Sequence, residues 1–312
     1  MLTPSAFLLP SVPTMLIDEQ RGDITEMIEA LQAAGRRTAV DAPEAIVVVS
    51  PRWVSTAAFL ADDSRRHRSV VDLPEFGVEP RHDCPGAQTL ARAIVEQAVK
   101  LGVRAATTKH GMDSGPGIPM HFIDRTRQLP VVPLSISDGT REEHRAWGEA
   151  IRLALNAWPG RVTFAVAGAL SWNLHAFNLR REVPECDALD ERVLAAMRDA
   201  QWPEIEAAVQ RLGAKALPEA DLRHLDVLRG FLLVAAASGH VLEREQLPGI
   251  GRGKVHRPGH VVERQQRTVV DTPFDTRGPM EPHALRAQPV GIPVCHHPAS
   301  TTCCARHDPF RT

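Results

Sequence analysis

The predicted fold depends on one stretch of sequence, Ala45-Ile46-Val47-Val48-Val49-Ser50-Pro51-Arg52-Trp53. Its first five residues are apolar and show no alternation with polar residues, which is typical of a strand buried on both faces of a sheet. The tip that follows this buried run is polar. A strand of this kind needs helices on both sides, and the stretch therefore predicts an α/β fold.

Strands and helices alternate on either side of this stretch. Further strands are predicted at residues 5–9, 104–107, 129–136 and 162–167. Helices are predicted at residues 24–34, 86–101, 140–157, 190–200, 203–212 and 221–237. Residues 1–253 are therefore expected to form an α/β domain with a single mixed or parallel central sheet flanked by helices.

From residue 254 the composition changes. Residues 254–312 contain eight prolines and six of the 14 histidines, and they lack a credible amphipathic helix. This tail, rich in Pro, Arg and His, is expected to be disordered because it cannot bury enough apolar surface. Its metal-capable residues lack the regular Cys-x-x-Cys spacing of a zinc fold. They are Cys295, His296, His297, Cys303, Cys304 and His307.

The composition of the 312 residues excludes some classes of partner. The formal net charge is -2, which predicts neither nucleic-acid binding nor attachment to a membrane. No apolar run reaches the ~20 residues that a transmembrane helix needs. Cysteines are sparse and unpatterned before the tail, which favours a cytoplasmic protein. Tyrosine is absent, so no tyrosine hydroxyl can serve as a catalytic acid.

Polar or turn-forming segments follow several of the predicted strands. Ligands of open α/β sheets bind beyond the carboxyl ends of the strands, so these segments are the candidate site. Ordinary connecting loops have a similar composition, and the pattern alone leaves both interpretations open. The segments are Leu9-Pro10-Ser11-Val12-Pro13, Ser50-Pro51-Arg52-Trp53, His110-Gly111-Met112-Asp113-Ser114-Gly115 and Ala167-Gly168-Ala169-Leu170-Ser171-Trp172-Asn173-Leu174.

Three other stretches share their order and spacing with a known family: Asp72-Leu73-Pro74-Glu75-Phe76-Gly77, Cys84-Pro85-Gly86-Ala87-Gln88-Thr89-Leu90-Ala91 and Leu129-Pro130-Val131-Val132-Pro133-Leu134-Ser135-Ile136. The Ser-Pro-x-Trp strand end at residues 50–53, the glycine-flanked segment at 113–115 and the segment at 168–174 extend the match. With these pieces, residues 5–250 resemble the class III extradiol ring-cleavage dioxygenases, the LigB-type family.

The resemblance implies an enzyme that opens catechol-like rings with dioxygen, using ferrous iron held by two histidines and a third ligand. In this chain the first iron-binding histidine falls at Pro10 or Ser11, and the second falls at Arg52. The histidine that helps to position substrate and oxygen is replaced by Ser114, and a further acid/base or metal-binding histidine by Trp172. A 2-His-1-carboxylate site needs three good ligands, and a guanidinium offers no lone pair. We therefore expect neither a metal nor another cofactor in this chain.

The family's carboxylate ligand near the start of the last helix corresponds loosely to Asp221. Arg52 is expected to fill the vacated cavity and to pair with Asp221 or Asp113. A buried metal would then be replaced by a buried ion pair, which is stable only when it is well hydrogen-bonded.

Several histidines remain close to the candidate site in the sequence. His110 and Asp113 can be interpreted as an acid/base pair, or as a loop histidine and a turn aspartate. His121, His175 and His224 do not stand at expected ligand positions. A relocated metal site that uses them is the alternative to ordinary structural histidines.

Three functional hypotheses follow. In the first, the chain is a non-catalytic family member that resembles the iron-free α subunit of 2-aminophenol 1,6-dioxygenase, so that a homo- or hetero-oligomer with a homologous catalytic subunit is expected. In the second, it is an active iron(II) dioxygenase that opens a catechol or aminophenol ring, with His110 as the base. In the third, it binds an aromatic small molecule whose carboxylate is gripped by Arg52.

Overall fold

Strand β2 (Ala45–Ser55) lies at the centre of the main sheet in the computed structural model, which describes residues 6–78 and 80–236. It pairs in parallel with β8 (Val162–Gly168) on one side and with β7 (Val131–Ser137) on the other. Residues Val47 and Val48 are fully buried although their side chains point to opposite faces. The prediction of a strand buried on both faces is confirmed.

The main sheet has six strands in the order β1, β8, β2, β7, β3 and β6. Its remaining strands are β1 (Ala6–Pro10), β3 (Phe59–Asp62) and β6 (Ala105–Thr108). Only the pairing of β3 with β7 is antiparallel among the pairings within this sheet. The predicted α/β fold with a mixed or parallel sheet is therefore confirmed as a mostly parallel sheet. A separate antiparallel pair is formed by β4 (Arg66–Arg68) and β5 (Asp83–Pro85).

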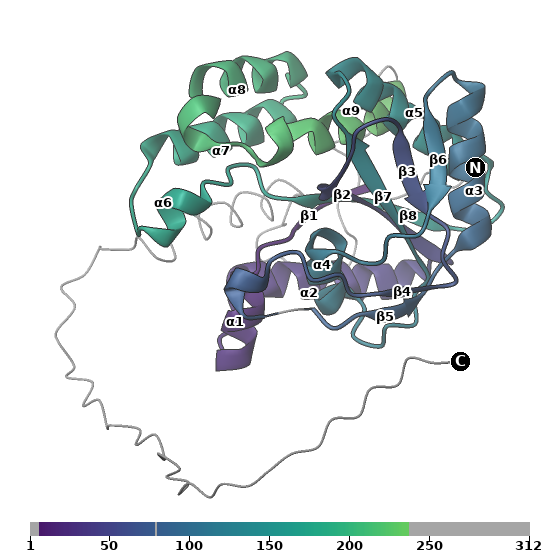
Figure 1. Cartoon of the computed structure of the whole chain (residues 1–312), viewed down its shortest axis with the longest axis horizontal. Coiled ribbons are helices and arrows are strands. Elements are labelled where there is room, and N and C mark those ends of the chain that lie inside the picture. The colour runs from purple at the N-terminus through teal and green to yellow at the C-terminus, as the bar shows by residue number, and fades with distance from the viewer. Residues whose placement is uncertain (1–5, 79, 237–312) are drawn as a thin grey trace, which may run out of the picture. The chain divides into compact units, whose positions relative to one another are not determined.

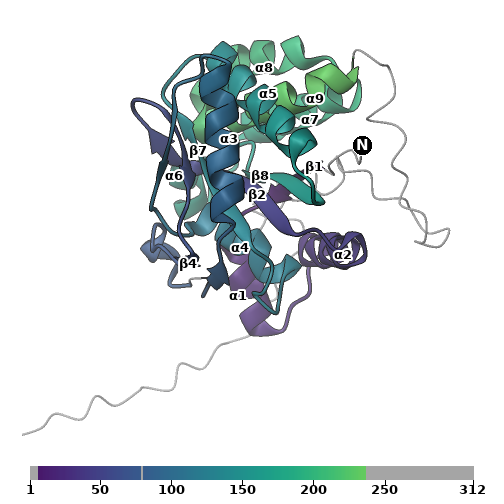
Figure 2. The same ribbon diagram turned by 90° about the vertical axis from the view of Figure 1, so that its right-hand side faces the viewer.

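Helices cover both faces of the main sheet, as the views in Figures 1 and 2 show. Successive residues of β2 alternate between two apolar clusters, with Val47 and Val49 in one and Ile46 and Val48 in the other. The first cluster is covered by α3 (Gln88–Lys100), α5 (Arg141–Ala157), α7 (Pro184–Arg198), α8 (Trp202–Ala216) and α9 (Arg223–Ala236). The second is covered by α1 (Thr14–Arg21), α2 (Glu26–Asp41) and α4 (Ser114–Ile123).

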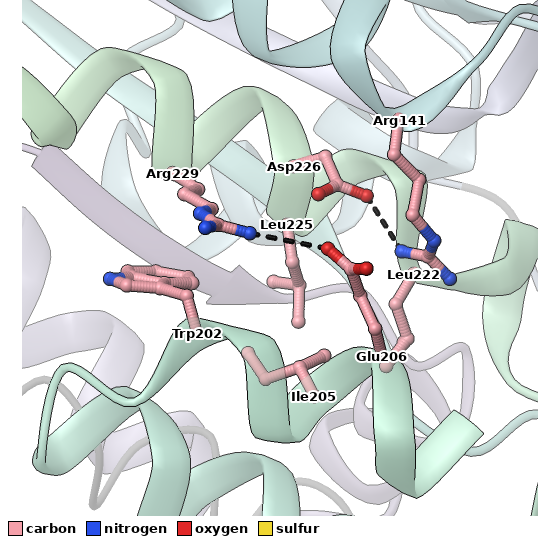
Figure 3. Close-up of a pocket in the computed structure, with 8 residues that line it drawn as sticks. All are labelled: Arg141, Trp202, Ile205, Glu206, Leu222, Leu225, Asp226 and Arg229. Atoms are coloured by element: carbon pink, nitrogen blue, oxygen red, sulfur yellow. Dashed lines mark hydrogen bonds and ion pairs between the residues drawn. The ribbon is translucent and has the colours of Figure 1, made fainter. Parts of the chain in front are cut away.

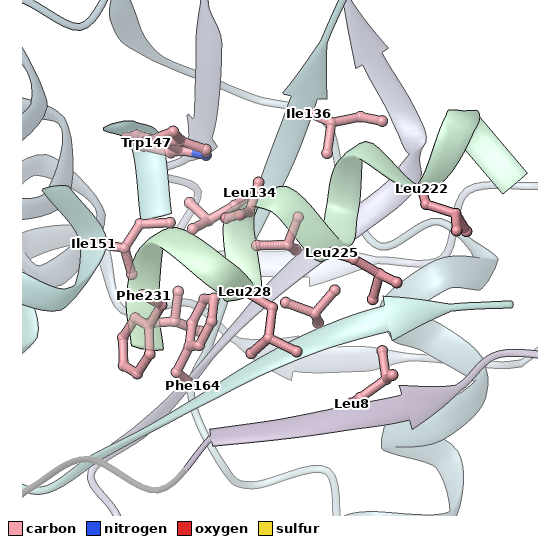
Figure 4. Close-up of a cluster of buried hydrophobic side chains, with 14 of the residues drawn as sticks. Leu8, Leu134, Ile136, Trp147, Ile151, Phe164, Leu222, Leu225, Leu228 and Phe231 are labelled. Carbon is pink, nitrogen blue, oxygen red and sulfur yellow. The ribbon is translucent and has the colours of Figure 1, made fainter. Parts of the chain in front are cut away.

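The larger apolar cluster surrounds the contact between the sheet and α5 and α9 (Figure 4). Phe164 of β8 stacks on Phe231 of α9 with ring centroids 4.1 Å apart. Trp147 of α5 is fully buried and stacks on Phe59 of β3 at 5.3 Å. Burial of such rings gives a large hydrophobic stabilisation. This rigid layer holds the carboxyl ends of the parallel strands in place.

Helix α4 was not predicted, because its sequence contains Gly115, Pro116, Gly117 and Pro119, residues that weaken a helix. Eight of its ten residues are nevertheless buried, and tertiary packing supplies what propensity does not. The Asp113 carboxylate caps the helix by accepting a hydrogen bond from the Gly115 N–H at 2.8 Å.

Short elements complete the described fold. They are η1 (Pro74–Phe76), α6 (Leu174–Asn178) and η2 (Glu219–Leu222). The predicted boundary between residues 253 and 254, and the predicted tail over 254–312, lie outside the described residues.

Candidate functional site

Arg52 lies in an irregular part of β2, near the carboxyl end of the strand. The pairing register between β2 and β7 shifts between Ser50 and Val54, so the residues between them bulge out of the ladder. Bulges redirect side chains, often next to functional sites. Here the Arg52 side chain contacts segments that follow β1 and β8, at the carboxyl edge of the parallel strands.

The guanidinium of Arg52 donates hydrogen bonds to acceptors from three other segments. Nε donates to Oε1 of Glu219 at 3.2 Å. Nη1 donates to Oγ of Ser114 at 2.6 Å, and Nη2 donates to the carbonyl oxygen of Ser11 at 2.6 Å. Because the Arg52 and Glu219 side chains are only 9% and 6% exposed, they form a buried ion pair, and each of the other two guanidinium nitrogens also donates a hydrogen bond.

Trp172 completes the surroundings of the guanidinium. Its ring centroid lies 4.8 Å from Cζ of Arg52, within the range of a cation–π contact. The backbone N–H of Trp172 donates to the carbonyl oxygen of Leu217 at 2.9 Å, which fixes the backbone of this segment.

Two of the acceptors are held by hydrogen bonds of their own. The Ser114 hydroxyl donates to Oδ2 of Asp72 at 2.6 Å, and the Ser114 N–H donates to Oδ1 of the same carboxylate at 3.1 Å. Oε2 of Glu219 accepts the Ala169 N–H at 2.5 Å. Arg52 therefore binds to groups whose positions do not depend on Arg52 alone.

Gly168 allows the buried carboxylate to approach the end of β8. A Cβ at this position, where φ is +145°, would lie 3.1 Å from each of Oε2 of Glu219, Nε2 of His224 and Cγ of Pro51. Burial raises the pKa of Glu219 above its ordinary value, although the Arg52 guanidinium partly opposes this shift. The Arg52 guanidinium thus favours the charged form of a carboxylate that burial disfavours.

His110 and Asp113 lie beside this ion pair. Nε2 of His110 is 3.4 Å from Oδ2 of Asp113, and the His110 ring stacks on Trp53 with centroids 4.1 Å apart. Oδ1 of Asp113 accepts a hydrogen bond from the Ser50 hydroxyl at 2.7 Å. The structure brings the predicted pair together, and it also gives Asp113 the structural role of capping α4.

Asp62 fixes the backbone that carries His110. Its Oδ2 accepts the N–H groups of His110 at 2.8 Å and Gly111 at 2.6 Å, and lies 3.3 Å from Nδ1 of His67. Burial opposes ionisation of Asp62, but the nearby His67 ring and the hydrogen bonds from these backbone groups outweigh it and lower its pKa. The charged Asp62 carboxylate therefore fixes the backbone of the loop at His110 and Gly111.

The expected partner of Arg52 is wrong: the carboxylate is Glu219 and not Asp221 or Asp113. The Asp221 side chain is 65% exposed, and its Oδ2 lies 3.9 Å from Nη2 of Arg223. The tight turn of η2 explains the difference, because it directs Glu219 inward and Asp221 outward. The sequence did contain a signal for the correct partner, because Glu219 is an acidic residue two positions before Asp221.

The other predicted positions are distributed around the site. Pro10 ends β1 opposite Gly168, and Ser11 directly after it is fully buried. Ser11, Ser114 and Trp172 all contact the Arg52 guanidinium. Of the positions predicted to have lost a histidine, Ser11, Ser114 and Trp172 thus surround the side chain at another such position, Arg52.

The three remaining candidate histidines do not come together as ligands. His121 of α4 lies 2.6 Å from Oε2 of Glu19 in α1. His175 is exposed on α6. His224 is fully buried with neither ring nitrogen hydrogen-bonded, and burial lowers its pKa to about 3. Among residues 6–78 and 80–236, no group of three or more His, Cys, Asp or Glu side chains is arranged to hold a metal ion.

Sequence comparison identifies the family. A model of the family described as the catalytic LigB subunit of aromatic ring-opening dioxygenase matches residues 5–252. The chain belongs to the LigB family. The predicted resemblance to extradiol dioxygenases is therefore confirmed.

Two known proteins show how far the similarity extends. A 3,4-dihydroxyphenylacetate 2,3-dioxygenase of Escherichia coli is 24% identical over 271 residues, which cover 80% of this chain and 96% of the relative. The crystal structure of the uncharacterized protein JW3007 from Escherichia coli K12 matches with a TM-score of 0.56 and 19% identity. That match covers 72% of this chain and 88% of the other chain, and it supports the fold.

The atoms around Arg52 do not fit the ferrous iron that membership of the LigB family implies. Iron of this kind is bound by imidazole and carboxylate ligands. Here the surroundings are a hydroxyl, a carbonyl, an indole face and the single carboxylate of Glu219, which already pairs with a guanidinium. A metal cation at this place would meet the positive charge of Arg52 at contact distance.

A separate small cavity lies between α8 and α9, remote in sequence from the strand-end segments (Figure 3). Its volume is about 10 Å³, and ion pairs line it between Glu206 and Arg229 and between Asp226 and Arg141. This is room for about one water molecule, so the cavity is a packing feature of the helical layer.

No helix within the described part of the chain has both the length and the apolar character needed to cross a bilayer.

Proposed function

We propose that this chain is a non-catalytic member of the LigB family that acts as a subunit beside a homologous catalytic chain. The observation that carries the proposal is the buried ion pair of Arg52 with Glu219, at a position where an iron-binding histidine is expected from the resemblance to the family. A guanidinium is always charged and supplies no lone pair, so it serves as neither a ligand nor a proton acceptor.

The packing of the site supports a structural role. Arg52 links the segments after β1 and β8, the start of α4 and the turn before α9. These links keep the LigB scaffold closed at the edge where a catalytic member needs open positions for oxygen and substrate. A subunit with this scaffold retains the surfaces of the family fold without the reaction.

The second candidate function is an active iron(II) dioxygenase that opens a catechol or aminophenol ring. It is favoured by the match to nearly the full length of a relative named as a ring-cleavage dioxygenase. In this reading His110, oriented by Asp113 and stacked on Trp53, is the candidate base. Binding of an aromatic acid by Arg52 is not proposed, because its guanidinium already has a carboxylate partner.

The test compares ring opening by the purified chain alone and after mixing with a LigB-family chain that keeps the metal-binding histidines. Catechol and 2-aminophenol are the substrates, and the partner alone is the control. We expect no turnover by this chain alone, co-elution of the two chains, and turnover by the mixture. Ring opening by this chain in isolation would favour the second candidate function, and failure of the chains to associate would contradict the subunit role.

A further inference from the structure

The surroundings of Arg52 form a pocket for a planar cation. Three acceptors approach three different nitrogen atoms of the guanidinium, at Oε1 of Glu219, Oγ of Ser114 and the carbonyl oxygen of Ser11. Cζ of the same group lies over the ring of Trp172, 4.8 Å from its centroid. Three hydrogen-bond acceptors, one of them a carboxylate, together with an aromatic ring suit the donors and charge of a guanidinium.

The pocket is held together by contacts that do not involve Arg52. Asp72 accepts two hydrogen bonds from Ser114, and the Ala169 N–H binds the second oxygen of Glu219. The third acceptor is a backbone carbonyl at the end of β1, next to a residue paired with β8. We therefore expect these bonds to persist when the side chain of residue 52 is shortened.

The buried carboxylate of Glu219 requires a positive charge nearby. It is almost fully buried, and its charge is balanced by the Arg52 guanidinium at 3.2 Å. A carboxylate left alone in such a place is costly, and a mobile cation that reaches it removes that cost. Shortening residue 52 leaves a gap that is still lined by the hydrogen-bond acceptors of the pocket.

We infer that this chain contains a preorganised guanidinium-binding pocket, of which Arg52 is the resident ligand. When residue 52 is shortened, free guanidinium or a small alkylguanidine binds in its place, held by Glu219, Ser114 and the Ser11 carbonyl. The pocket takes planar guanidino compounds in preference to ammonium or alkali-metal cations, which lack the flat array of donors.

The experiment measures thermal unfolding of the full-length Arg52→Ala variant with and without guanidinium or methylguanidinium at low millimolar concentration. Ammonium and sodium at matched ionic strength are the comparison cations. We expect a rise in Tm of about 3–6 °C at a guanidinium concentration ten times Kd, and no rise with the comparison cations. Equal stabilisation by all cations, or by none, would overturn the inference.

Two further variants make the result specific. Arg66→Ala removes an exposed arginine that pairs with Asp83, and this control is expected to gain nothing from guanidinium. Arg52→Ala combined with Glu219→Gln removes the carboxylate and is expected to abolish the effect. Stabilisation that survives Glu219→Gln, or that also appears with Arg66→Ala, would contradict a built pocket.

Should Arg52→Ala fail to fold in buffer alone, refolding from urea is compared with and without guanidinium. Recovery of folded protein only with guanidinium supports the pocket, and failure under both conditions contradicts it. The pocket and the proposed subunit role fail separately, because cation rescue tests the former whereas ring opening and association test the latter.

Discussion

Nε of Arg52 lies 3.2 Å from Oε1 of Glu219, and both side chains are more than nine-tenths buried. This pair joins the end of the central strand to the turn before the last described helix, across 167 positions of sequence. Its energetic value depends on the hydrogen bonds that surround it, because a buried pair has to offset the loss of hydration of both charges.

A double-mutant cycle on Arg52→Met and Glu219→Gln tests this coupling. Each single change leaves a buried charge without its partner, so we expect a loss of about 3–5 kcal/mol in the free energy of unfolding. The double variant is expected to lose less than the sum, because neither charge remains. Urea denaturation of the four proteins gives the coupling energy, and additive losses would show that the two residues act independently.

Ser114→Ala tests the link between Arg52 and Asp72. The hydroxyl accepts from the guanidinium and donates to the carboxylate, so its removal breaks two charge-assisted hydrogen bonds. We expect a loss of about 1.5–3 kcal/mol in urea denaturation. Ser55→Ala, at the partly exposed end of β2, is the control and is expected to change stability by less than about 0.5 kcal/mol. Equal effects at the two positions would argue against the link.

The sequence predicted most of the α/β frame because the central strands are continuous apolar runs and most helices have a clear hydrophobic period. Residues 45–49, for example, have no polar position at all, and β2 is central in the sheet. Helix α4 was missed because its glycines and prolines disfavour a helix in isolation, whereas burial among α2 and the sheet stabilises it. Local propensity cannot report such tertiary packing.

The positions around Arg52 were selected from the sequence, but its acidic partner was predicted wrongly. Ser11, Arg52, Ser114 and Trp172 were selected from motif order, and the structure brings them together. Glu219 was missed because the choice between acidic residues in a short turn depends on backbone dihedral angles, and Asp221 has φ of 52°. Sequence spacing carries no information about a left-handed turn of this kind.

His224→Leu tests the effect of a buried neutral histidine on the pH dependence of stability. Burial lowers the pKa of His224 to about 3, from 6.5 for the ordinary group. Because the folded-state value is below the unfolded one, the unfolded state binds the proton first, and stability is lost as pH falls below 6.5. The wild type is therefore expected to lose stability toward pH 3 at up to about 1.4 kcal/mol per pH unit from this group.

The leucine variant is expected to show a shallower fall in stability over the same acid range. Near neutral pH its loss should be below about 1.5 kcal/mol, because neither ring nitrogen of His224 has a hydrogen-bond partner to lose. Denaturation midpoints measured from neutral to acid pH check both statements. An unchanged acid slope in the variant would show that His224 does not carry this dependence.

Trp202→Ala and Glu206→Gln separate the forces that hold α8 against α9. Trp202 is only 6% exposed within the larger apolar cluster, so its removal should cost about 3–5 kcal/mol. Glu206 is 36% exposed and pairs with Arg145 and Arg229, each at 3.2 Å. Its neutralisation should cost no more than about 1 kcal/mol, because water and salt screen such pairs. A larger loss for Glu206→Gln than for Trp202→Ala in thermal unfolding would reverse this assignment.

The iron content of the full-length wild-type chain tests whether Arg52 excludes iron. It is measured by elemental analysis after anaerobic loading with ferrous ion and removal of free metal. We expect iron far below one equivalent per chain, because a guanidinium and one already-paired carboxylate cannot hold the ion. Retention of about one iron per chain that is lost on changing Glu219 or a nearby histidine would contradict it.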